Sequence, residues 1–319
     1  MVERISLDDL FDRRLTFPDR GAQRRFARLV GIDDAKTRLT KLLGMAINPA
    51  RVRSWLERHY KGAMIILDLI ERRPPLVVLA GDVGTGKTEL AETVGDAIAR
   101  EENIEVTLFP LSLAARGSGR VGEMTKLISS AFEETVDFAR RLKRDEGKSG
   151  GGVILLVDEA DALTQSRDTL QMHHEDRAGV NAFIRGVDRL AEQRLPAAVI
   201  LCTNRLGAID PAVQRRAAQI FEFTRPNNEQ RRAVLEPTLS ELEFGSGEID
   251  KIVELTGPSK KRSYGFTYSD LTQRFLPTLV LDAYPSGAVS FKQAIEAIKS
   301  LRPTPPFGNM TETTDDEQS

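Results

Sequence analysis

The sequence predicts an α/β fold, in which a doubly wound domain with a five-stranded parallel sheet is followed by a small α-helical domain. Five short apolar segments alternate with helical patterns between about residues 30 and 226, as in sheets whose parallel strands are joined by crossover helices. A glycine-rich segment ending in lysine and threonine follows the first apolar segment directly. Beyond residue 226 only helical patterns recur.

The elements are expected in the following order. Residues 1–28 form a short, partly ordered extension, the large domain covers 29–226, the helical domain covers 227–302, and the proline-containing, acidic end over 303–319 is a disordered tail. Apolar runs predict strands over 74–81, 104–112, 151–161, 197–204 and 219–226. Helical periodicity is expected over 30–47, 87–101, 123–143 and 178–193, and then roughly over 228–242, 247–256, 268–284 and 290–301.

The composition indicates a soluble protein of a reducing compartment. Of 319 residues 40% are hydrophobic, and 45 Lys and Arg nearly balance 47 Asp and Glu, which disfavours non-specific nucleic-acid binding. The single cysteine, Cys202, excludes an internal disulfide and is expected to be an inert core thiol. No signal peptide and no apolar stretch of about 18 residues is present, so we expect a cytoplasmic protein without a membrane segment.

The segment after the first strand has the spacing of a phosphate-binding loop. Glycines allow backbone N–H groups to converge on phosphate oxygens, and the next helix adds positive charge at its N-terminus. Lys87 is expected to reach the β- and γ-phosphates and Thr88 to bind Mg²⁺, while an ordinary glycine-rich turn is the alternative. The predicted nucleotide-binding residues are Gly81, Asp82, Val83, Gly84, Thr85, Gly86, Lys87, Thr88 and Glu89.

Polar residues at the ends of later strands complete the predicted catalytic site. Asp158 and Glu159 end an apolar strand, where Asp158 would hold Mg²⁺ through water and Glu159 would polarise an attacking water. Asn204 ends the next strand and would orient that water. Arg215 and Arg216 precede the last strand, and we expect Arg216 to reach the nucleotide of a neighbouring subunit. The alternatives are an acidic pair that merely ends a strand and solvated surface arginines.

This ordered series, with a helical lid after it, resembles the AAA+ ATPases over nearly residues 25–302. The resemblance implies hexameric rings that bind ATP and Mg²⁺ at subunit interfaces. The segment "LVGIDDAKTRL" is similar to the one that precedes the family's first strand, which implies that Val30, Gly31 and Ile32 line the adenine pocket.

Several stretches resemble more specifically the pachytene-checkpoint ATPases, which remodel HORMA-domain proteins. They are "DEADALTQSR", "VNAFIRGVDRL", "IDPAVQRRA", in which Arg216 matches the family's single arginine, "RFLPTLVLDAY" and "VSFKQAIEAI". The short N-terminal region is similar to that of bacterial relatives in CBASS anti-phage systems. There the ATPase acts on a HORMA protein that activates a nucleotide cyclase, a synthase of cyclic oligonucleotides.

The region of the central pore departs from the family's pattern at its first loop. In "ARGSGRVGEM" Arg120 stands where many translocases have a pore-loop aromatic, so Gly119, Arg120 and Val121 form the expected first pore loop, with a phosphate-contacting loop or a solvated turn as alternatives. His173 and His174 occupy the region of a second pore loop, where a solvated loop is the alternative.

In the lid, Asp270-Leu271 stand where family members often have a glycine-arginine pair that senses nucleotide, so that arginine is missing. Arg274, one turn later, is the substitute candidate, and a surface salt bridge is the alternative.

The predicted function is an ATP-driven ring that grips a flexible segment of a HORMA-domain protein and partly unfolds it. A nucleic-acid AAA+ machine, such as a clamp loader or helicase loader, is the main alternative. A small-molecule kinase and a non-hydrolysing scaffold fit the series of motifs less well.

Overall fold

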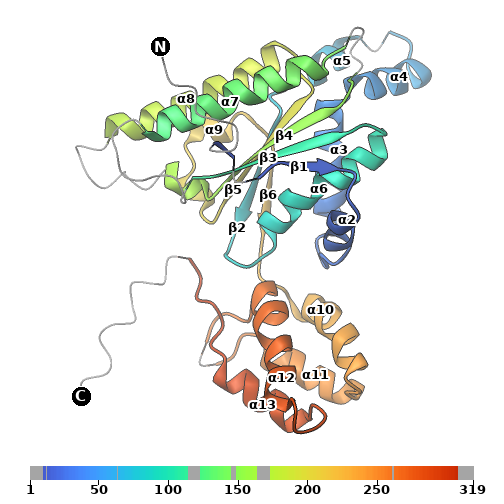
Figure 1. Cartoon of the computed structure of the whole chain (residues 1–319), viewed down its shortest axis with the longest axis vertical. Coiled ribbons are helices and arrows are strands. Elements are labelled where there is room, and N and C mark those ends of the chain that lie inside the picture. The colour runs from blue at the N-terminus through green and yellow to red at the C-terminus, as the bar shows by residue number, and fades with distance from the viewer. Residues whose placement is uncertain are drawn as a thin grey trace. The chain divides into compact units, whose positions relative to one another are not determined.

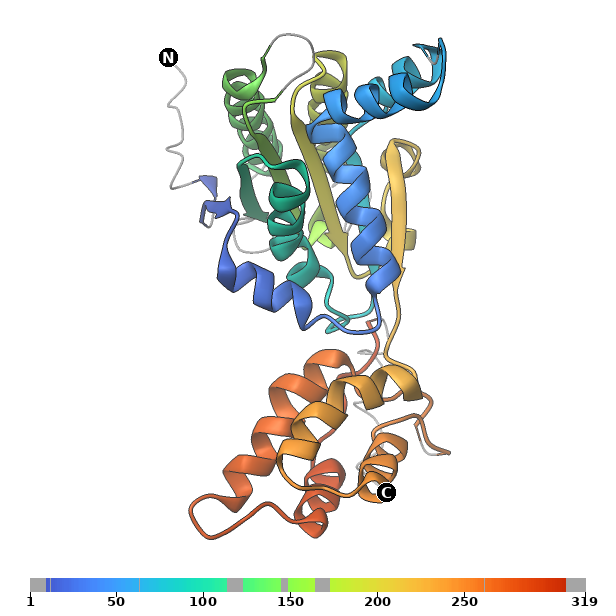
Figure 2. The same ribbon diagram turned by 90° about the vertical axis from the view of Figure 1, so that its right-hand side faces the viewer.

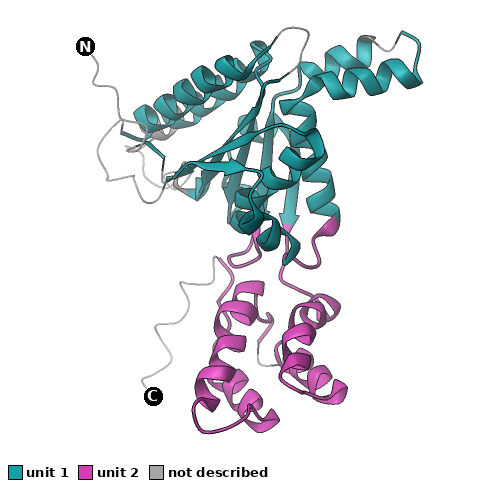
Figure 3. Ribbon diagram, turned by 45° about the vertical axis from the view of Figure 1, so that its right-hand side comes forward, with its two compact units in different colours: residues 1–28, 34–80, 88–222 teal, residues 29–33, 81–87, 223–319 magenta. Residues whose placement is uncertain are grey.

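Contacts within the chain define two compact units (Figure 3). The computed structural model describes residues 10–11, 13–62, 64–113, 123–144, 149–163, 173–260 and 262–307. Unit 1 comprises residues 1–28, 34–80 and 88–222, and unit 2 comprises 29–33, 81–87 and 223–319. The change of unit after residue 222 lies close to the predicted domain boundary at 226, but unit 2 also takes in the phosphate loop.

Unit 1 is built on a six-stranded sheet in the order β1-β3-β4-β5-β2-β6. The five predicted strands are all present, as β2 (Leu76–Gly81), β3 (Val106–Ser112), β4 (Gly152–Asp158), β5 (Ala197–Thr203) and β6 (Ala217–Phe223). The expectation of a purely parallel five-stranded sheet is corrected by β1 (Leu15–Phe17), which pairs antiparallel with β3. Strands β3, β4, β5 and β2 pair in parallel, and Cys202 on β5 is buried as expected.

Helices cover both faces of this sheet (Figures 1 and 2). One face carries α3 (Asp33–Ile47) and α6 (Lys87–Glu102), and the other carries α7 (Glu123–Leu142) and α8 (His173–Glu192). Phe132 of α7 and Phe183 of α8 meet edge to face at 5.4 Å. Gly186 keeps these helices close, because a Cβ there would lie 2.2 Å from the Phe132 ring. The resulting buried layers fix the sheet edge from which the candidate site residues project.

The region between α3 and β2 and the N-terminal extension hold helices that were not predicted. They are α2 (Arg20–Ala27), α4 (Pro49–His59) and α5 (Met64–Glu71), with Pro49 at the first turn of α4. Leu56 of α4 and Leu67 of α5 are buried, whereas other large apolar side chains of these helices are exposed, for example Trp55 by 49%, Ile65 by 80% and Leu69 by 63%. None of the helices in the described ranges is both long and apolar enough to cross a membrane.

Unit 2 is helical beyond β6, as predicted. Its elements are α10 (Asn228–Glu241), α11 (Ser246–Leu255), the π-helical turn η4 (Asp270–Phe275), α12 (Leu276–Ala283) and α13 (Phe291–Ser300). Phe266, Leu271 and Phe275 lie in its core. The short connections of unit 1 are η2 (Ala160–Leu163), η3 (Leu206–Ala208) and α9 (Pro211–Gln214).

The start of the expected disordered tail is ordered within unit 2. Thr304 donates to Asp270 from its backbone N at 3.0 Å and from its hydroxyl at 2.8 Å. Pro303 is buried and Phe307 N donates to Asp82 Oδ1 at 3.2 Å. These contacts correct the prediction for residues 303–307, and residues 308–319 lie outside the described residues.

Candidate functional site

The sheet topology brings Asp158, Asn204 and the start of the phosphate loop to one edge. Strand β5 lies between β4 and β2, with Val157 opposite Leu201 and Ala80 opposite Thr203. Because these strands are parallel, their carboxyl ends meet at the same edge, where open α/β sheets bind ligands. The phosphate loop leaves β2 there, Asp158 ends β4, and Asn204 follows β5.

The phosphate loop has the backbone that its glycines predict. Gly81, Gly84 and Gly86 have φ angles of 144°, 72° and 93°, which residues with a Cβ rarely adopt. The Lys87 ammonium donates to the carbonyl oxygens of Gly81 and Asp82, both at 2.8 Å, and is only 6% exposed. The lysine therefore stabilises the loop around its own side chain.

Two hard oxygen donors in unit 1 fit the expected magnesium. Thr88 is exposed in the first turn of α6, and Asp158 is half-buried at the end of β4. A hydroxyl and a carboxylate suit Mg²⁺, which keeps several waters and takes few protein ligands. The described ranges hold no group of three or more His, Cys, Asp or Glu side chains placed to bind a metal. Glu89, predicted to bind nucleotide, pairs with Arg25 at 3.4 Å.

Glu159 has a strained backbone at the sheet edge. Its φ is 54°, and its N–H donates to Asp158 Oδ1 at 2.8 Å. A left-handed conformation in a residue with a Cβ costs roughly 1 kcal/mol or more and often marks functional sites. Glu159 therefore does not continue the extended backbone of β4. Its side chain is exposed, next to the half-buried Asp158.

Asp161 is a site residue that the sequence reasoning missed. It is 7% exposed and accepts from Thr203 Oγ1 at 2.7 Å and from Asn204 N at 3.0 Å. These bonds hold the end of β5 against the turn that follows β4. Asp161 therefore positions Asn204. The sequence feature that could have indicated this role is the third carboxylate of "DEAD".

The two predicted finger arginines differ in environment. Arg215 is exposed at the end of α9, whereas Arg216 is about one-third exposed. Arg216 donates through Nε and Nη2 to both carboxylate oxygens of Asp188, at 2.8 and 3.0 Å, and through Nη1 to Ala212 O at 3.2 Å. The hydrogen bond to Asp188 raises the pKa of Arg216, which stays charged. Asp188 on α8 was not predicted.

The predicted adenine segment lies in unit 2. Gly31 has a φ of 76°, and its carbonyl accepts from Gln230 Nε2 of α10 at 2.8 Å. At this φ a side chain is strained, and a Cβ on Gly31 would lie 2.7 Å from Gln230 Cγ and 3.0 Å from the Tyr268 hydroxyl, so glycine is favoured between Val30 and Ile32. Burial raises the pKa of Tyr268 to about 12, which keeps this hydroxyl protonated.

Arg274 is engaged inside the lid. Its Nη1 donates to Asp270 Oδ1 at 2.9 Å and to Arg302 O at 3.0 Å. Burial alone would raise the pKa of Asp270, but hydrogen bonds from Thr267, Thr304 and Arg274 together lower it. The ion pair that was the alternative for Arg274 is therefore present.

Comparison with known proteins places this geometry in a family. The model of the "ATPase family associated with various cellular activities (AAA)" matches residues 77–225. The chain is 58% identical over 302 residues to CD-NTase-associated protein 6 of Escherichia coli strain MS 115-1, covering 95% of this chain and 97% of that protein. It is 35% identical over 307 residues to the protein of that name from E. coli strain KTE188, covering 96% and 100%. The chain belongs to the CD-NTase-associated protein 6 family of AAA ATPases.

Solved structures support the same membership. A chain in the structure of the E. coli MS115-1 HORMA:CdnC:Trip13 complex matches with a TM-score of 0.87 and 56% identity, covering 95% of this chain and 99% of that one. Rhizobiales Trip13 matches with a TM-score of 0.71 and 48% identity, covering 93% and 100%. The resemblance to AAA+ ATPases of the pachytene-checkpoint type and the predicted fold class are confirmed.

The structure gives limited information on the five residues predicted to form pore loops in this member of the family. Gly119, Arg120 and Val121 fall outside the described residues. The backbone of His173 and His174 begins α8, which corrects the expected loop at this position. The pore-loop roles of all five residues stay predictions.

Proposed function

We propose that the chain is an ATP-driven protein remodeller that works as a hexameric ring on a HORMA-domain protein. Its action would disassemble a complex of that protein with a nucleotide cyclase in cyclic-oligonucleotide anti-phage signalling. The observation that carries the proposal is the match, over 95% of this chain at 56% identity, to a chain in the HORMA:CdnC:Trip13 complex.

The site residues support hydrolysis of ATP as the driving reaction. The loop backbone and Lys87 would bind the phosphates, and Thr88 and Asp158 would hold Mg²⁺, which neutralises phosphate charge when bound. Glu159 would accept a proton from water as that water attacks the γ-phosphorus, which breaks the bond to ADP and releases phosphate. Asn204, held through Asp161, would orient the same water.

Arg216 supports a shared site between neighbouring subunits. Its bonds to Asp188 and Ala212 use three of its five N–H groups, so two can donate to a phosphate oxygen. A fixed guanidinium supplied by a neighbour stabilises the charge of phosphoryl transfer. Each hydrolysis would then displace the pore loop around Arg120, which grips a flexible segment of the substrate and opens it locally.

A trapping experiment tests this function. Glu159→Gln should bind ATP, hydrolyse it at least about a hundredfold more slowly, and retain a purified HORMA-domain protein in a ring-sized species by light scattering. Glu192→Gln, which changes an exposed carboxylate at the end of α8, is the matched control and should behave like the wild type. A Glu159→Gln protein that stays monomeric with ATP, or that turns ATP over normally, would refute the proposal.

A further inference from the structure

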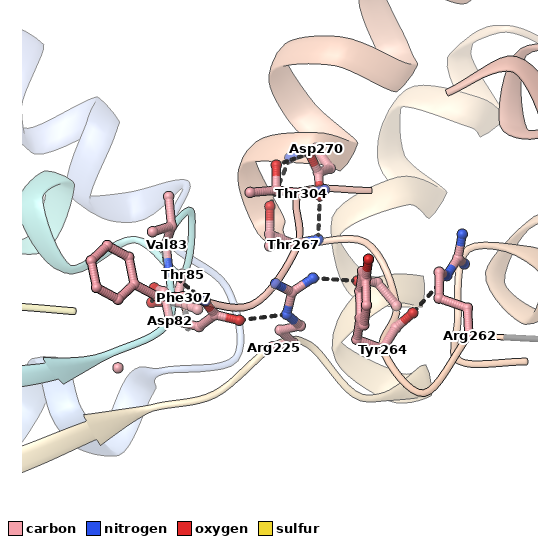
Figure 4. A network of polar contacts seen from close by, with 12 residues as sticks. Asp82, Val83, Thr85, Arg225, Arg262, Tyr264, Thr267, Asp270, Thr304 and Phe307 are labelled. Atoms are coloured by element: carbon pink, nitrogen blue, oxygen red, sulfur yellow. Dashed lines mark hydrogen bonds and ion pairs between the residues drawn. The ribbon is translucent and has the colours of Figure 1, made fainter. Parts of the chain in front are cut away.

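The phosphate loop and the lid are joined by an ion pair inside unit 2 (Figure 4). Asp82, the second residue of the loop, accepts at Oδ2 from Arg225 Nε at 2.6 Å. Arg225 lies in the connector between β6 and α10, and the two side chains are only 13% (Arg225) and 19% (Asp82) exposed. Solvent ions therefore screen this pair less than a surface pair.

The same arginine contacts the lid through Nη1 and through the face of its guanidinium, while its buried Nη2 makes no hydrogen bond among the described residues. Its Nη1 donates to Gly265 O at 2.7 Å, and its Cζ lies 4.9 Å from the centroid of the Tyr264 ring. A second contact lies nearby, where Ser269 N donates to Gly84 O at 3.1 Å. The loop thus contacts the segment that leads into η4 directly and through Arg225.

The charge of Asp82 needs cancellation if the loop binds a triphosphate. Its Oδ1 accepts from the backbone N–H groups of Val83, at 2.8 Å, and Phe307, at 3.2 Å, which are neutral donors. An uncompensated carboxylate would repel phosphate, because like charges in a partly buried site interact strongly. Arg225 supplies a positive charge bonded directly to this carboxylate, whereas Lys87 donates to the Asp82 carbonyl oxygen.

We propose that the Asp82–Arg225 pair couples the nucleotide on the phosphate loop to the lid. Arg225 cancels the carboxylate that would repel the phosphates, and it transmits displacement of the loop to Gly265 and Tyr264. Both charged residues are positioning residues that act through the loop backbone. The inference rests on the proposed binding of ATP by this loop.

The first test measures the affinity for a fluorescent ATP analogue with Mg²⁺. Arg225→Ala should weaken binding on the order of tenfold, because Asp82 is left with its charge in place. The double variant Asp82→Ala/Arg225→Ala should bind the analogue more tightly than Arg225→Ala alone, since repulsion and compensation are removed together. The matched control is Arg262→Ala: Arg262 donates to Tyr264 O at 2.7 Å and to Gly257 O at 2.9 Å, so it supports the same lid segment.

The outcomes separate charge cancellation from simple loop ordering. Arg262→Ala should leave the affinity unchanged, and an equal loss in Arg262→Ala and Arg225→Ala would overturn the inference. So would a double variant as weak as Arg225→Ala. Thermal unfolding establishes that each variant is folded. Failure of the proposed function is distinct, since it would appear as Lys87→Ala binding the analogue as tightly as the wild type.

Hydrogen–deuterium exchange tests the coupling itself. ATP should slow exchange in residues 263–270 of the wild type and of Arg262→Ala. In Asp82→Ala/Arg225→Ala that protection should be lost although the analogue still binds. Protection that persists in the double variant would show that the pair does not transmit nucleotide binding to the lid.

Discussion

Replacing Asp188 by alanine should lower ATP turnover without unfolding the protein. Asp188 holds Arg216 through two hydrogen bonds of 2.8 and 3.0 Å. The Arg216 and Asp188 side chains are 32% and 35% exposed, so solvent screens the pair and its loss should cost no more than about 1 kcal/mol of unfolding free energy. Turnover should respond more strongly, because a misplaced catalytic group can cost on the order of a hundredfold.

The expected order of effects is set by what each change leaves in place. Arg216→Ala removes the cation and should cost about 10³-fold or more in kcat. Asp188→Ala keeps the cation but frees its orientation, so kcat should fall about 10- to 100-fold with the KM for ATP within about twofold. Asp137→Ala is the matched control, because Asp137 pairs with Arg140 at 3.1 Å on the surface of α7.

Mixing variant subunits tests whether Asp188 acts across the subunit interface of the proposed ring. A Lys87→Ala subunit keeps an intact finger, and an Asp188→Ala subunit keeps an intact phosphate loop. Mixing them should restore hydrolysis where the finger of a Lys87→Ala subunit reaches the phosphate loop of an Asp188→Ala subunit. Mixing Arg216→Ala with Asp188→Ala should not restore it, because neither variant has an intact finger. Normal turnover of Asp188→Ala beside an inactive Arg216→Ala, or absence of rescue by mixing, would refute the reasoning.

Three further substitutions probe the loop, the strand end and the lid. Gly81→Ala would place a Cβ 2.0 Å from Phe223 O at a φ of 144°, so a lower melting temperature and loss of ATP binding are expected, and wild-type values would contradict the geometry. Asp161→Ala removes the acceptor of Asn204 N and should lower kcat while ATP affinity is retained, as single-turnover assays and titration can show. Asp270→Asn should lower the unfolding free energy by about 1–3 kcal/mol at pH 7 in urea. Because the pKa of Asp270 is lowered in the folded state, its stabilisation is present above about pH 4 and lost as pH falls through the folded pKa, so the difference should shrink in acid.

Local patterns predicted the sheet and the helices of the lid well, because the central strands β2, β4 and β5 are nearly continuous apolar runs. The run expected over 151–161, for example, is the strand β4, Gly152–Asp158. Strand β1 has only three residues, too few for a readable period, and it exists through its pairing with β3. Helix α5 was missed for the opposite reason: it is strongly apolar but exposes Ile65 and Leu69, so no one-sided stripe indicates where it packs.

The same distinction holds in the site. The phosphate loop and the pair Asp158-Glu159 could be predicted because their chemistry lies within a few consecutive residues. The charged partners of Arg216 and of Asp82 could not be predicted, because residues far apart in the sequence come together only in the folded chain. Asp188 is 28 residues from Arg216, and Asp82 is 143 residues from Arg225.

The carboxylate partner of each arginine decides what that arginine can do in nucleotide chemistry. Asp188 takes one edge of Arg216 and leaves N–H groups for a phosphate oxygen, which suits a group that must reach outward. Asp270 accepts from both Arg274 and Thr304, so this arginine helps to hold the C-terminal segment of the chain against the lid. Arg274 would have to break its bond to Asp270 to contact a nucleotide. The carboxylate partner of Arg225 is Asp82, which belongs to the phosphate loop itself. Any shift of the loop on binding ATP would therefore act through this 2.6 Å contact on the segment between β6 and α10.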